Sequence, residues 1–218
     1  DRFSKIDGQV IHSWSDVLDV IGGAKQGEGE NAKGRLIELE LVRAGELKTI
    51  EIIPMMSGTA SNSLALSSFL RSYGSVLCHS ESHIYNDEGG GPEFFSGGGK
   101  LLTLFHNSGK LRAVDIEKKI KQINFKGKQH SKIFGISITQ LAENGTIYST
   151  DEILEISKVC KSNELYLHMD GARFANALAF QREISPADAT WKVGVDCLSL
   201  GATKNGAMAA EVIIFFKK

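Results

Sequence analysis

The sequence predicts an α/β domain with three layers and a mainly parallel sheet. After residue 50, short apolar runs alternate along the chain with segments whose apolar residues recur at the helical period. Several of the apolar runs are continuous, which is typical of strands buried on both faces. Alternation of strand and helix of this kind indicates helices packed on both faces of a mostly parallel sheet.

Seven short apolar runs are predicted to form the strands of this sheet. They lie at 50–55, 75–79, 100–105, 132–139, 164–169, 195–200 and 211–216.

Three helical segments are predicted between these strands, at 60–70, 115–123 and 149–161. In the second segment Ile116, Ile120 and Ile123 fall on one face. The third segment opens with a Ser/Thr cap followed by acidic residues, a typical helix start.

The first 50 residues are less regular, so we expect an N-terminal helical segment at 1–50 and a main domain at 51–218. Two short helices are predicted at 16–25 and 32–42, around a polar loop at 27–31.

Composition limits the classes of partner. The formal net charge of −1 does not favour nucleic acid or an anionic membrane surface. No run approaches the roughly 20 apolar residues of a membrane helix. The start DRFSKIDG lacks the pattern of a signal peptide. Cys78, Cys160 and Cys197 form no CxxC pair and are predicted to be buried free thiols. We therefore expect a cytoplasmic protein in a reducing compartment.

The stretch SGTASN at 57–62 follows one predicted strand and opens a helix. Free N–H groups at a helix N-terminus, with Gly58 for close approach and the Thr59 hydroxyl, make an anion site. The alternative is an ordinary turn between strand and helix.

His79 and His83 are four residues apart, a spacing that invites a metal site. The zincin motif needs Glu directly after its first His, and Ser80 occupies that position. We therefore expect no metal. A histidine that ends an apolar strand and precedes acids and glycines is expected to line a pocket.

Asp170 and Arg173 lie in LHMDGAR, where a strongly apolar run ends. Open α/β sheets bind their ligands at the carboxyl ends of strands. Asp170 is predicted either to cap the following helix or to face a cationic partner, with Arg173 one helical turn away, and this stretch alone favours the cap and a surface Arg.

Lys204 stands alone among small residues in GATKNGAMAAE, between two apolar runs. A lysine amine in a low-dielectric surrounding is a nucleophile toward carbonyl groups. The alternative is a solvated loop lysine. A P-loop is excluded, because Asn205 follows where that motif needs Ser or Thr.

Together these groups meet the needs of pyridoxal phosphate. The cofactor requires an anion cradle, a flat neighbour for its ring, a carboxylate for the pyridine nitrogen and an amine for its aldehyde. We therefore predict pyridoxal 5'-phosphate as the cofactor.

The chain resembles the threonine aldolase family, in the β-eliminating lyase group of fold-type I pyridoxal-phosphate enzymes. The matching stretches are SGTASNSLAL, HSESHIYNDEGGGPEFFSGG, LHMDGARFANA and DCLSLGATKNGAMAAE. The resemblance implies an aspartate aminotransferase-like large domain. It also implies retro-aldol cleavage of a β-hydroxy-α-amino acid, such as L-threonine or L-allo-threonine, to glycine and an aldehyde.

The resemblance implies a role for each site residue. Gly58 and Thr59 hold the phosphate, His83 stacks on the ring, and Lys204 bonds the aldehyde. Asp170 and Arg173 face the pyridine nitrogen and the ring edge. His83 is the favoured general base, and Glu88, or a water between the two, is the alternative.

Three features depart from the family pattern. The start matches its Ser-Asp-rich segment poorly, and Glu28-Gly29-Glu30-Asn31 stands where a Tyr-Gly-acidic-acidic loop is usual. The family's smaller C-terminal domain lies outside the sequence, so we interpret the chain as a truncated large domain. A β-eliminating lyase acting on another amino acid and a non-catalytic remnant stay open as alternatives. The resemblance further implies a homodimer or homotetramer.

Overall fold

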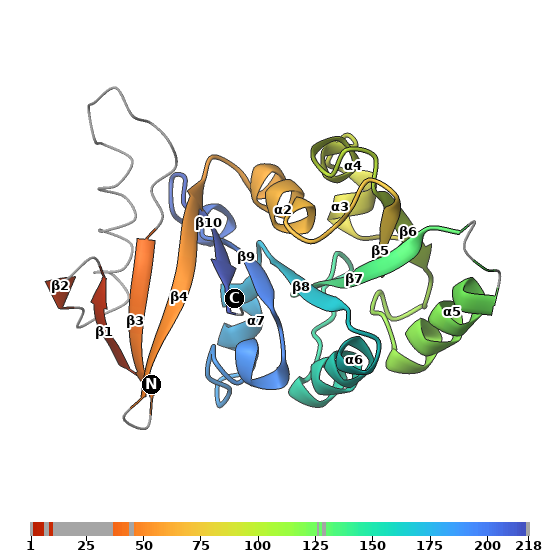
Figure 1. Cartoon of the computed structure of the whole chain (residues 1–218). Coiled ribbons are helices and arrows are strands. Elements are labelled where there is room, and N and C mark those ends of the chain that lie inside the picture. The colour runs from red at the N-terminus through yellow and green to blue at the C-terminus, as the bar shows by residue number, and fades with distance from the viewer. Residues whose placement is uncertain are drawn as a thin grey trace.

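The computed structural model describes residues 2–6, 9–10, 37–43, 46–125, 127 and 130–216, with side chains from residue 52 onward. Its strands form one ten-stranded sheet in the order β2-β1-β3-β4-β10-β9-β8-β7-β5-β6 (Figure 1). Their bounds are β1 Arg2–Ile6, β2 Gln9–Val10, β3 Ile37–Arg43, β4 Glu46–Met55, β5 Gly74–His79, β6 Lys100–Leu104, β7 Lys132–Thr139, β8 Tyr166–Gly171, β9 Cys197–Gly201 and β10 Glu211–Phe215.

Strands β4 to β10 correspond to the seven predicted strands, and the expected α/β fold is confirmed. Strands β9, β8, β7, β5 and β6 are parallel neighbours. Strand β10 pairs antiparallel with both β9 and β4. The carboxyl ends of the parallel strands therefore meet at one edge, together with the start of β10 and the end of β4.

Helices cover both faces of the sheet (Figure 1). Helices α2 to α4 lie above it in this view and α5 and α6 lie below it. The bounds are α2 Gly58–Ser67, α3 His83–Asn86, α4 Gly91–Phe95, α5 Ala113–Phe125, α6 Thr150–Ser162 and α7 Phe174–Phe180, with 3-10 turns η1 Trp191–Val193 and η2 Thr203–Asn205.

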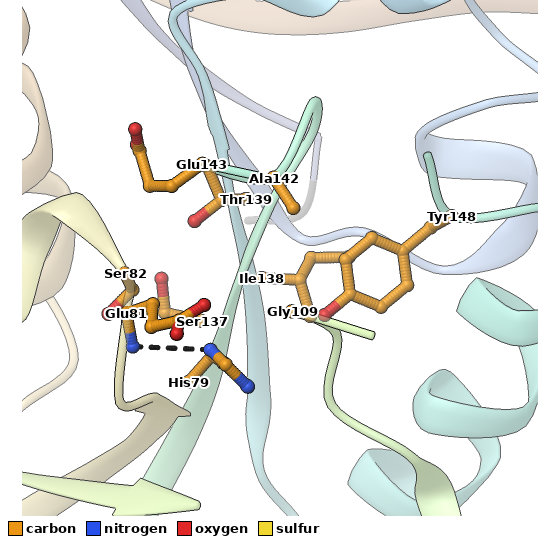
Figure 2. A pocket seen from close by; sticks show the side chains of 10 residues that line it. All are labelled: His79, Glu81, Ser82, Gly109, Ser137, Ile138, Thr139, Ala142, Glu143 and Tyr148. Atoms are coloured by element: carbon orange, nitrogen blue, oxygen red, sulfur yellow. Dashed lines mark hydrogen bonds between the residues drawn. The ribbon is translucent and has the colours of Figure 1, made fainter. Parts of the chain in front are cut away.

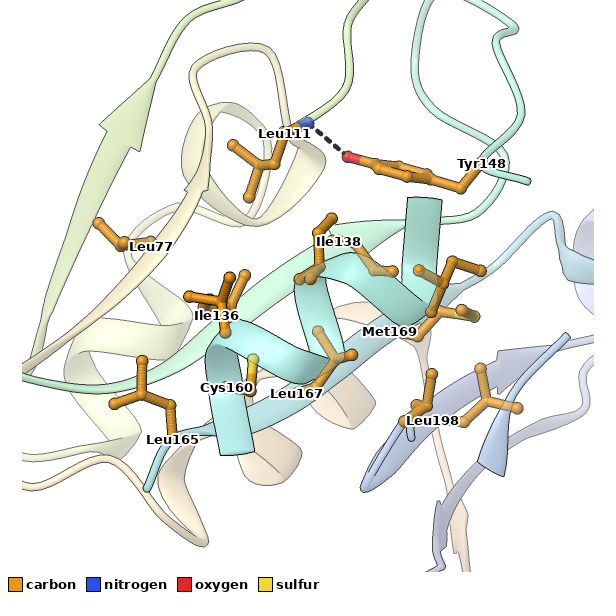
Figure 3. Packing of buried hydrophobic residues seen from close by; sticks show 14 of the residues in the cluster. Leu77, Leu111, Ile136, Ile138, Tyr148, Cys160, Leu165, Leu167, Met169 and Leu198 are labelled. Atoms are coloured by element: carbon orange, nitrogen blue, oxygen red, sulfur yellow. Dashed lines mark hydrogen bonds between the residues drawn. The ribbon is translucent and has the colours of Figure 1, made fainter. Parts of the chain in front are cut away.

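Alternate residues of the buried strands serve different layers. In β5, Val76 and Cys78 pack with Leu66 of α2, whereas Leu77 belongs to the larger core below the sheet. That larger core includes Ile136, Leu167, Cys160 and Tyr148 among its labelled members (Figure 3). The two-residue period of a strand thus accounts for continuous apolar runs with a helix on each side.

The predicted start of the helix at 149–161 is confirmed by its capping box. The Ser149 hydroxyl accepts a hydrogen bond from the Glu152 N–H at 3.2 Å, and the Glu152 carboxylate accepts one from the Ser149 N–H at 2.8 Å. Lys110 also donates to the Glu152 carboxylate, which ties the start of α6 to the loop before α5.

The predicted helix at 32–42 is wrong where the structure describes it. Residues Ile37–Arg43 form β3, which pairs antiparallel with β4. Ile37, Leu39 and Leu41 alternate with Glu38 and Glu40, and this is the two-residue period of a strand rather than a helical period. The predicted helix at 16–25 and loop at 27–31, including Glu28-Gly29-Glu30-Asn31, lie outside the described residues. Strand β4 spans Glu46–Met55 and so crosses the expected division between residues 50 and 51.

All three cysteines are buried and free, as the sequence predicted. In the described part of the chain, no helix is long and apolar enough to cross a membrane.

Candidate active site

The start of α2 offers unpaired backbone donors. Ser57 caps the helix: its hydroxyl accepts from the Ala60 N–H at 3.1 Å, and its carbonyl accepts from the Ser61 N–H. Within the described residues, the N–H groups of Gly58 and Thr59 have no acceptor. Helix N-termini with free N–H groups attract anions. The expected anion site is therefore geometrically available.

A buried amide joins two carboxylates next to this helix start. The Asn62 side-chain nitrogen donates to Glu88 Oε1 at 2.7 Å and to Asp170 Oδ2 at 3.1 Å. All three side chains are buried. Asn62 lies one turn into α2, Glu88 lies between α3 and α4, and Asp170 lies near the end of β8. Three distant parts of the chain thus converge at this edge of the sheet.

Glu88 has an unusual proton affinity for a glutamate. Burial raises the pKa of Glu88 to about 7, the hydrogen bond from Asn62 opposes that rise, and the charge of Asp170 adds to it. Its Oε2 atom is buried and has no hydrogen-bond partner among the described residues. A carboxyl group with a pKa near neutrality can give or take a proton under physiological conditions.

His83 lies beside Glu88 at the start of α3. Its Nδ1 is 3.1 Å from Glu88 Oε1, and its side chain is 29% exposed. If Nδ1 donates to the carboxylate, Nε2 is left as an acceptor that can take a proton from a ligand. The pair thus has the geometry of a base and the carboxylate that orients it.

Asp170 also accepts a backbone hydrogen bond. Its Oδ1 accepts from the Ala172 N–H at 3.1 Å. Burial raises the pKa of Asp170, whereas the bonds from Ala172 and Asn62 lower it. Asp170 therefore stabilises the turn to Ala172 through Oδ1, and it joins the buried cluster with Asn62 through Oδ2.

Arg173 forms an ion pair that the sequence did not suggest. Its Nη1 donates to Glu143 Oε1 at 3.1 Å, with about a quarter of each side chain exposed. Glu143 also lines a small cavity at the carboxyl ends of β5 and β7, together with His79, Thr139 and Tyr148 (Figure 2). The expected pocket role of His79 is confirmed.

His79 fixes the loops around this cavity. Its Nδ1 accepts from the Glu81 N–H at 3.2 Å (Figure 2), and its Nε2 lies 3.0 Å from the His106 carbonyl oxygen and 3.1 Å from the His106 backbone nitrogen. His79 is thereby committed to backbone contacts, while His83 is free to meet a ligand.

Lys204 is exposed, in the turn η2 that follows β9. The expected low-dielectric surrounding is absent among the described residues, and the role of Lys204 stays a prediction. The turn itself is well defined: Asn205 donates from its side chain to the Gly201 carbonyl at 3.0 Å. Lys204 lies at the same edge of the sheet as Asp170. Gly171 pairs with Leu200, so β8 and β9 end side by side and the turn η2 follows β9 at that edge.

Glu211, which the sequence analysis did not single out, lies next to the anion site. A Cβ atom placed on Gly58 would lie 3.8 Å from Glu211 Oε2, and the same carboxylate crowds Gly201 on the neighbouring strand. Glu211 is 8% exposed. A buried carboxylate therefore stands beside the donors at the start of α2.

Comparison with known proteins identifies the group to which this arrangement belongs. A model of the family described as beta-eliminating lyase matches residues 36–218. This chain belongs to the beta-eliminating lyase family. The match covers the described site residues and strands β3 to β10, and strands β1 and β2 lie before it.

Two similar proteins are both named low specificity L-threonine aldolase. Low specificity L-threonine aldolases of Pseudomonas sp. (strain NCIMB 10558) and Pseudomonas aeruginosa are 47% and 46% identical to the chain over 169 and 171 residues. Each match covers 77% of this chain and 48% of the relative. The chain therefore spans about half the length of the curated relatives that it matches.

Solved structures show the same fold. A Leishmania major threonine aldolase is 32% identical, with a TM-score of 0.68 over 76% of this chain and 47% of that one. A structure described as a putative L-allo-threonine aldolase from Listeria monocytogenes matches 90% of this chain and 54% of its own, with a TM-score of 0.56. At 16% identity the second likeness concerns the fold alone.

Proposed function

We propose that the protein containing this chain uses pyridoxal phosphate to cleave threonine, allo-threonine or a related β-hydroxy-α-amino acid to glycine and an aldehyde. The names of the family members at 47% and 46% identity support this reaction. The structural observation that carries the proposal is the buried group of Asp170, Asn62 and Glu88 beside His83. It offers a carboxylate for a cationic ring and a carboxyl–histidine pair for proton transfer.

The residues present fit the cofactor. The unpaired N–H groups of Gly58 and Thr59 suit its phosphate, and Gly58 leaves room for close approach. Asp170 can accept a hydrogen bond from a protonated pyridine nitrogen. The exposed Lys204 amine is accessible to the aldehyde. When bound, pyridoxal phosphate supplies an electron sink for the bond that breaks.

His83 is proposed to take the proton from the β-hydroxyl group of the substrate. Glu88 Oε1 lies 3.1 Å from His83 Nδ1, so the carboxylate can accept from Nδ1 and leave Nε2 as the base, the arrangement in which a carboxylate orients a histidine. Removal of the hydroxyl proton allows the Cα–Cβ bond to break and the aldehyde to leave. General-base help of this kind is typically worth about 10²–10⁴-fold in rate.

Arg173 is proposed to lie along the ring edge, held by its ion pair with Glu143. We also propose that the protein is a homodimer or homotetramer. Phe94, Phe95 and Phe105 are more than half exposed, which is consistent with a face covered by another subunit. Sedimentation at micromolar concentration that gives only monomers would contradict this part of the proposal.

Two measurements test the reaction and its lysine. The protein is incubated with pyridoxal phosphate, reduced with borohydride, digested and mapped by mass spectrometry. We expect the modified peptide to contain Lys204. Lys204→Arg should abolish that modification, and Lys192→Arg serves as a control that keeps it.

The products decide the reaction class. Incubation with threonine is expected to give glycine and acetaldehyde in equal amounts, and activity should fall by at least about 10²-fold in Lys204→Arg. Pyruvate and ammonia as products would replace the proposal with a β-elimination. Modification at a lysine other than Lys204 would overturn the assigned attachment site.

A further inference from the structure

Asn62 shares one side-chain amide group between two buried carboxylates, at 2.7 Å from Glu88 and 3.1 Å from Asp170. We propose that Asn62 is a positioning residue that links Glu88 to Asp170, so that the charge carried near Asp170 sets whether Glu88 keeps its proton. The link itself follows from these two hydrogen bonds. Its catalytic consequence rests on the proposed function, because only there do Asp170 and Glu88 have chemical roles.

The fold holds Asn62 in this position. It lies one helical turn after Gly58 on α2, between Ser61 and Ser63, and all three side chains are buried. Further along the helix, Ala65 packs with Met55, Cys197 and Ile213, which fixes α2 on β4, β9 and β10. An amide held in this way cannot follow either carboxylate if one of them moves.

The orientation of the amide follows from its partners. Its nitrogen faces the two carboxylates, and its Oδ1 atom is buried without a partner among the described residues. The reverse orientation would aim the amide oxygen at Asp170 and Glu88 and could gain at most one hydrogen bond, from a protonated carboxyl group. Asn62 is therefore a shared donor.

The balance of charge around the two carboxylates is unfavourable when both are ionised. Glu88 is faced by His83 from α3, by Asn62 from α2 and by Asp170 from β8. Asp170 is faced by His83 and Glu143, and Glu143 is already paired with Arg173. Two buried anions that share one neutral donor repel each other, so one of them favours its protonated form. A cation placed against Asp170 removes that repulsion and releases the proton of Glu88.

The consequence for catalysis is that a cation bound beside Asp170 readies the Glu88–His83 pair to take a proton. With no cation beside Asp170, Glu88 keeps its proton. A protonated ring nitrogen at Asp170 would lower the proton affinity of Glu88, so that its carboxylate can accept from His83 Nδ1 and hold the ring of the base in place. Asn62 keeps the two carboxylates close enough for this coupling.

The test is a pH titration of the carboxyl groups in the protein without added cofactor. ¹³C NMR of side-chain-labelled glutamate and aspartate is the readout. Glu88→Gln and Asp170→Asn assign the two resonances. Asn62→Leu removes the shared donor and keeps the volume similar. A hydrogen bond to a charged group is worth about 1.5–3 kcal/mol, so both midpoints should rise by about 1–2 pH units.

Ser63→Ala is the matched control. Ser63 is the next residue on α2, is fully buried, and has a hydroxyl without a partner among the described residues. Its removal should leave both midpoints within about 0.3 pH unit of the wild type. Equal shifts in Ser63→Ala and Asn62→Leu, or no shift in Asn62→Leu, would overturn the proposal.

Asp170→Asn provides a second, independent arm. It removes the neighbouring charge, so the midpoint of Glu88 should fall by about one pH unit even if Asn62→Leu does not fold. An unchanged Glu88 midpoint in this variant would also overturn the link.

The outcomes separate the link from the proposed reaction. An intact titration link in a protein that makes no glycine would contradict only the proposed function. If both hold, the acid limb of the kcat/KM profile should move to higher pH in Asn62→Leu and stay in place in Ser63→Ala.

Discussion

The carboxylate of Glu211 lies where an incoming phosphate would come close to it. Its Oε2 atom would be 3.8 Å from a Cβ on Gly58, at the start of α2, and its side chain is buried. Helix donors favour an anion at this place, whereas Glu211 disfavours one. The two effects together set how strongly the site prefers a phosphorylated ligand.

Glu211→Gln should therefore bind pyridoxal phosphate more tightly without changing its affinity for pyridoxal, which lacks the phosphate. Removing one like charge at close range should raise the ratio of the two affinities about tenfold or more. Absorbance titrations with both ligands measure this ratio. Glu155→Gln, an exposed change on α6, should leave it unchanged. Weaker binding of pyridoxal phosphate by Glu211→Gln would mean that Glu211 supports the site rather than opposing an anion.

The positions of several site residues follow from the sequence, because strand ends can be located from apolar runs. Gly58 and Asp170 were placed in this way. Asn62 was missed, although its position four residues after Gly58 puts it on the same helix face. Its importance depends on Glu88 and Asp170, which come from distant segments. The exposure of Lys204 depends on which elements cover its loop, and no local pattern contains that information.

Among the secondary-structure elements, strand β8 carries a histidine that ties three strands together. His168 is fully buried; its Nδ1 is 2.9 Å from the Ser137 hydroxyl of β7, and its Nε2 is 3.0 Å from the Ser199 hydroxyl of β9. Burial lowers the pKa of His168 from 6.5 to about 3. The folded protein thus holds this ring neutral where the unfolded chain would protonate it.

The pH dependence of stability follows from that difference. Below pH 6.5 the unfolded state binds the extra proton, so the free energy of unfolding should fall by about 1.4 kcal/mol per pH unit toward pH 3. Above pH 6.5 this contribution is fully present. His168→Gln should lose that share of the slope in urea titrations between pH 7 and 5. The exposed His130→Gln should keep it, and equal slopes in wild type and His168→Gln would contradict the prediction.

Long helices were predictable and short helices were not. The helices at 60–70, 115–123 and 149–161 correspond to α2, α5 and α6, because each carries enough residues for a helical period. Helices α3 and α4 have four and five residues, too few to show one. At Ile37–Arg43 the alternation was in the sequence, but the apolar content was interpreted as a helix.

The order of the strands across the whole molecule depends on contacts that no local segment contains. Strand β10, late in the chain, lies between β4 and β9 and pairs antiparallel with both. It joins the parallel part of the sheet to the part built by β4. Its residues serve both layers, since Val212 and Ile214 belong to the core below the sheet and Ile213 packs above it.

Ile213→Ala should consequently destabilise the entire domain. The side chain is 1% exposed, and comparable changes in cores cost about 2–5 kcal/mol. Urea unfolding followed by circular dichroism and tryptophan fluorescence should show both signals shifting together. Val114→Ala, at a half-exposed position of α5, should change the free energy of unfolding by no more than about 0.5 kcal/mol. Separate transitions for the two signals would mean that β10 does not unite the sheet.

The position of Glu211 beside Gly58 also has a consequence for synthesis on the ribosome. The two residues are 211 − 58 = 153 positions apart, yet they border the same anion site. At about 5–20 residues per second, the second residue is added about 8–30 s after the first. During that interval a nascent chain carries the donors of α2 without the strand that completes their surroundings. The carboxylate that opposes an anion at this site is thus added after the donors that attract one, so the final preference of the site for a phosphate is set only once β10 has been made.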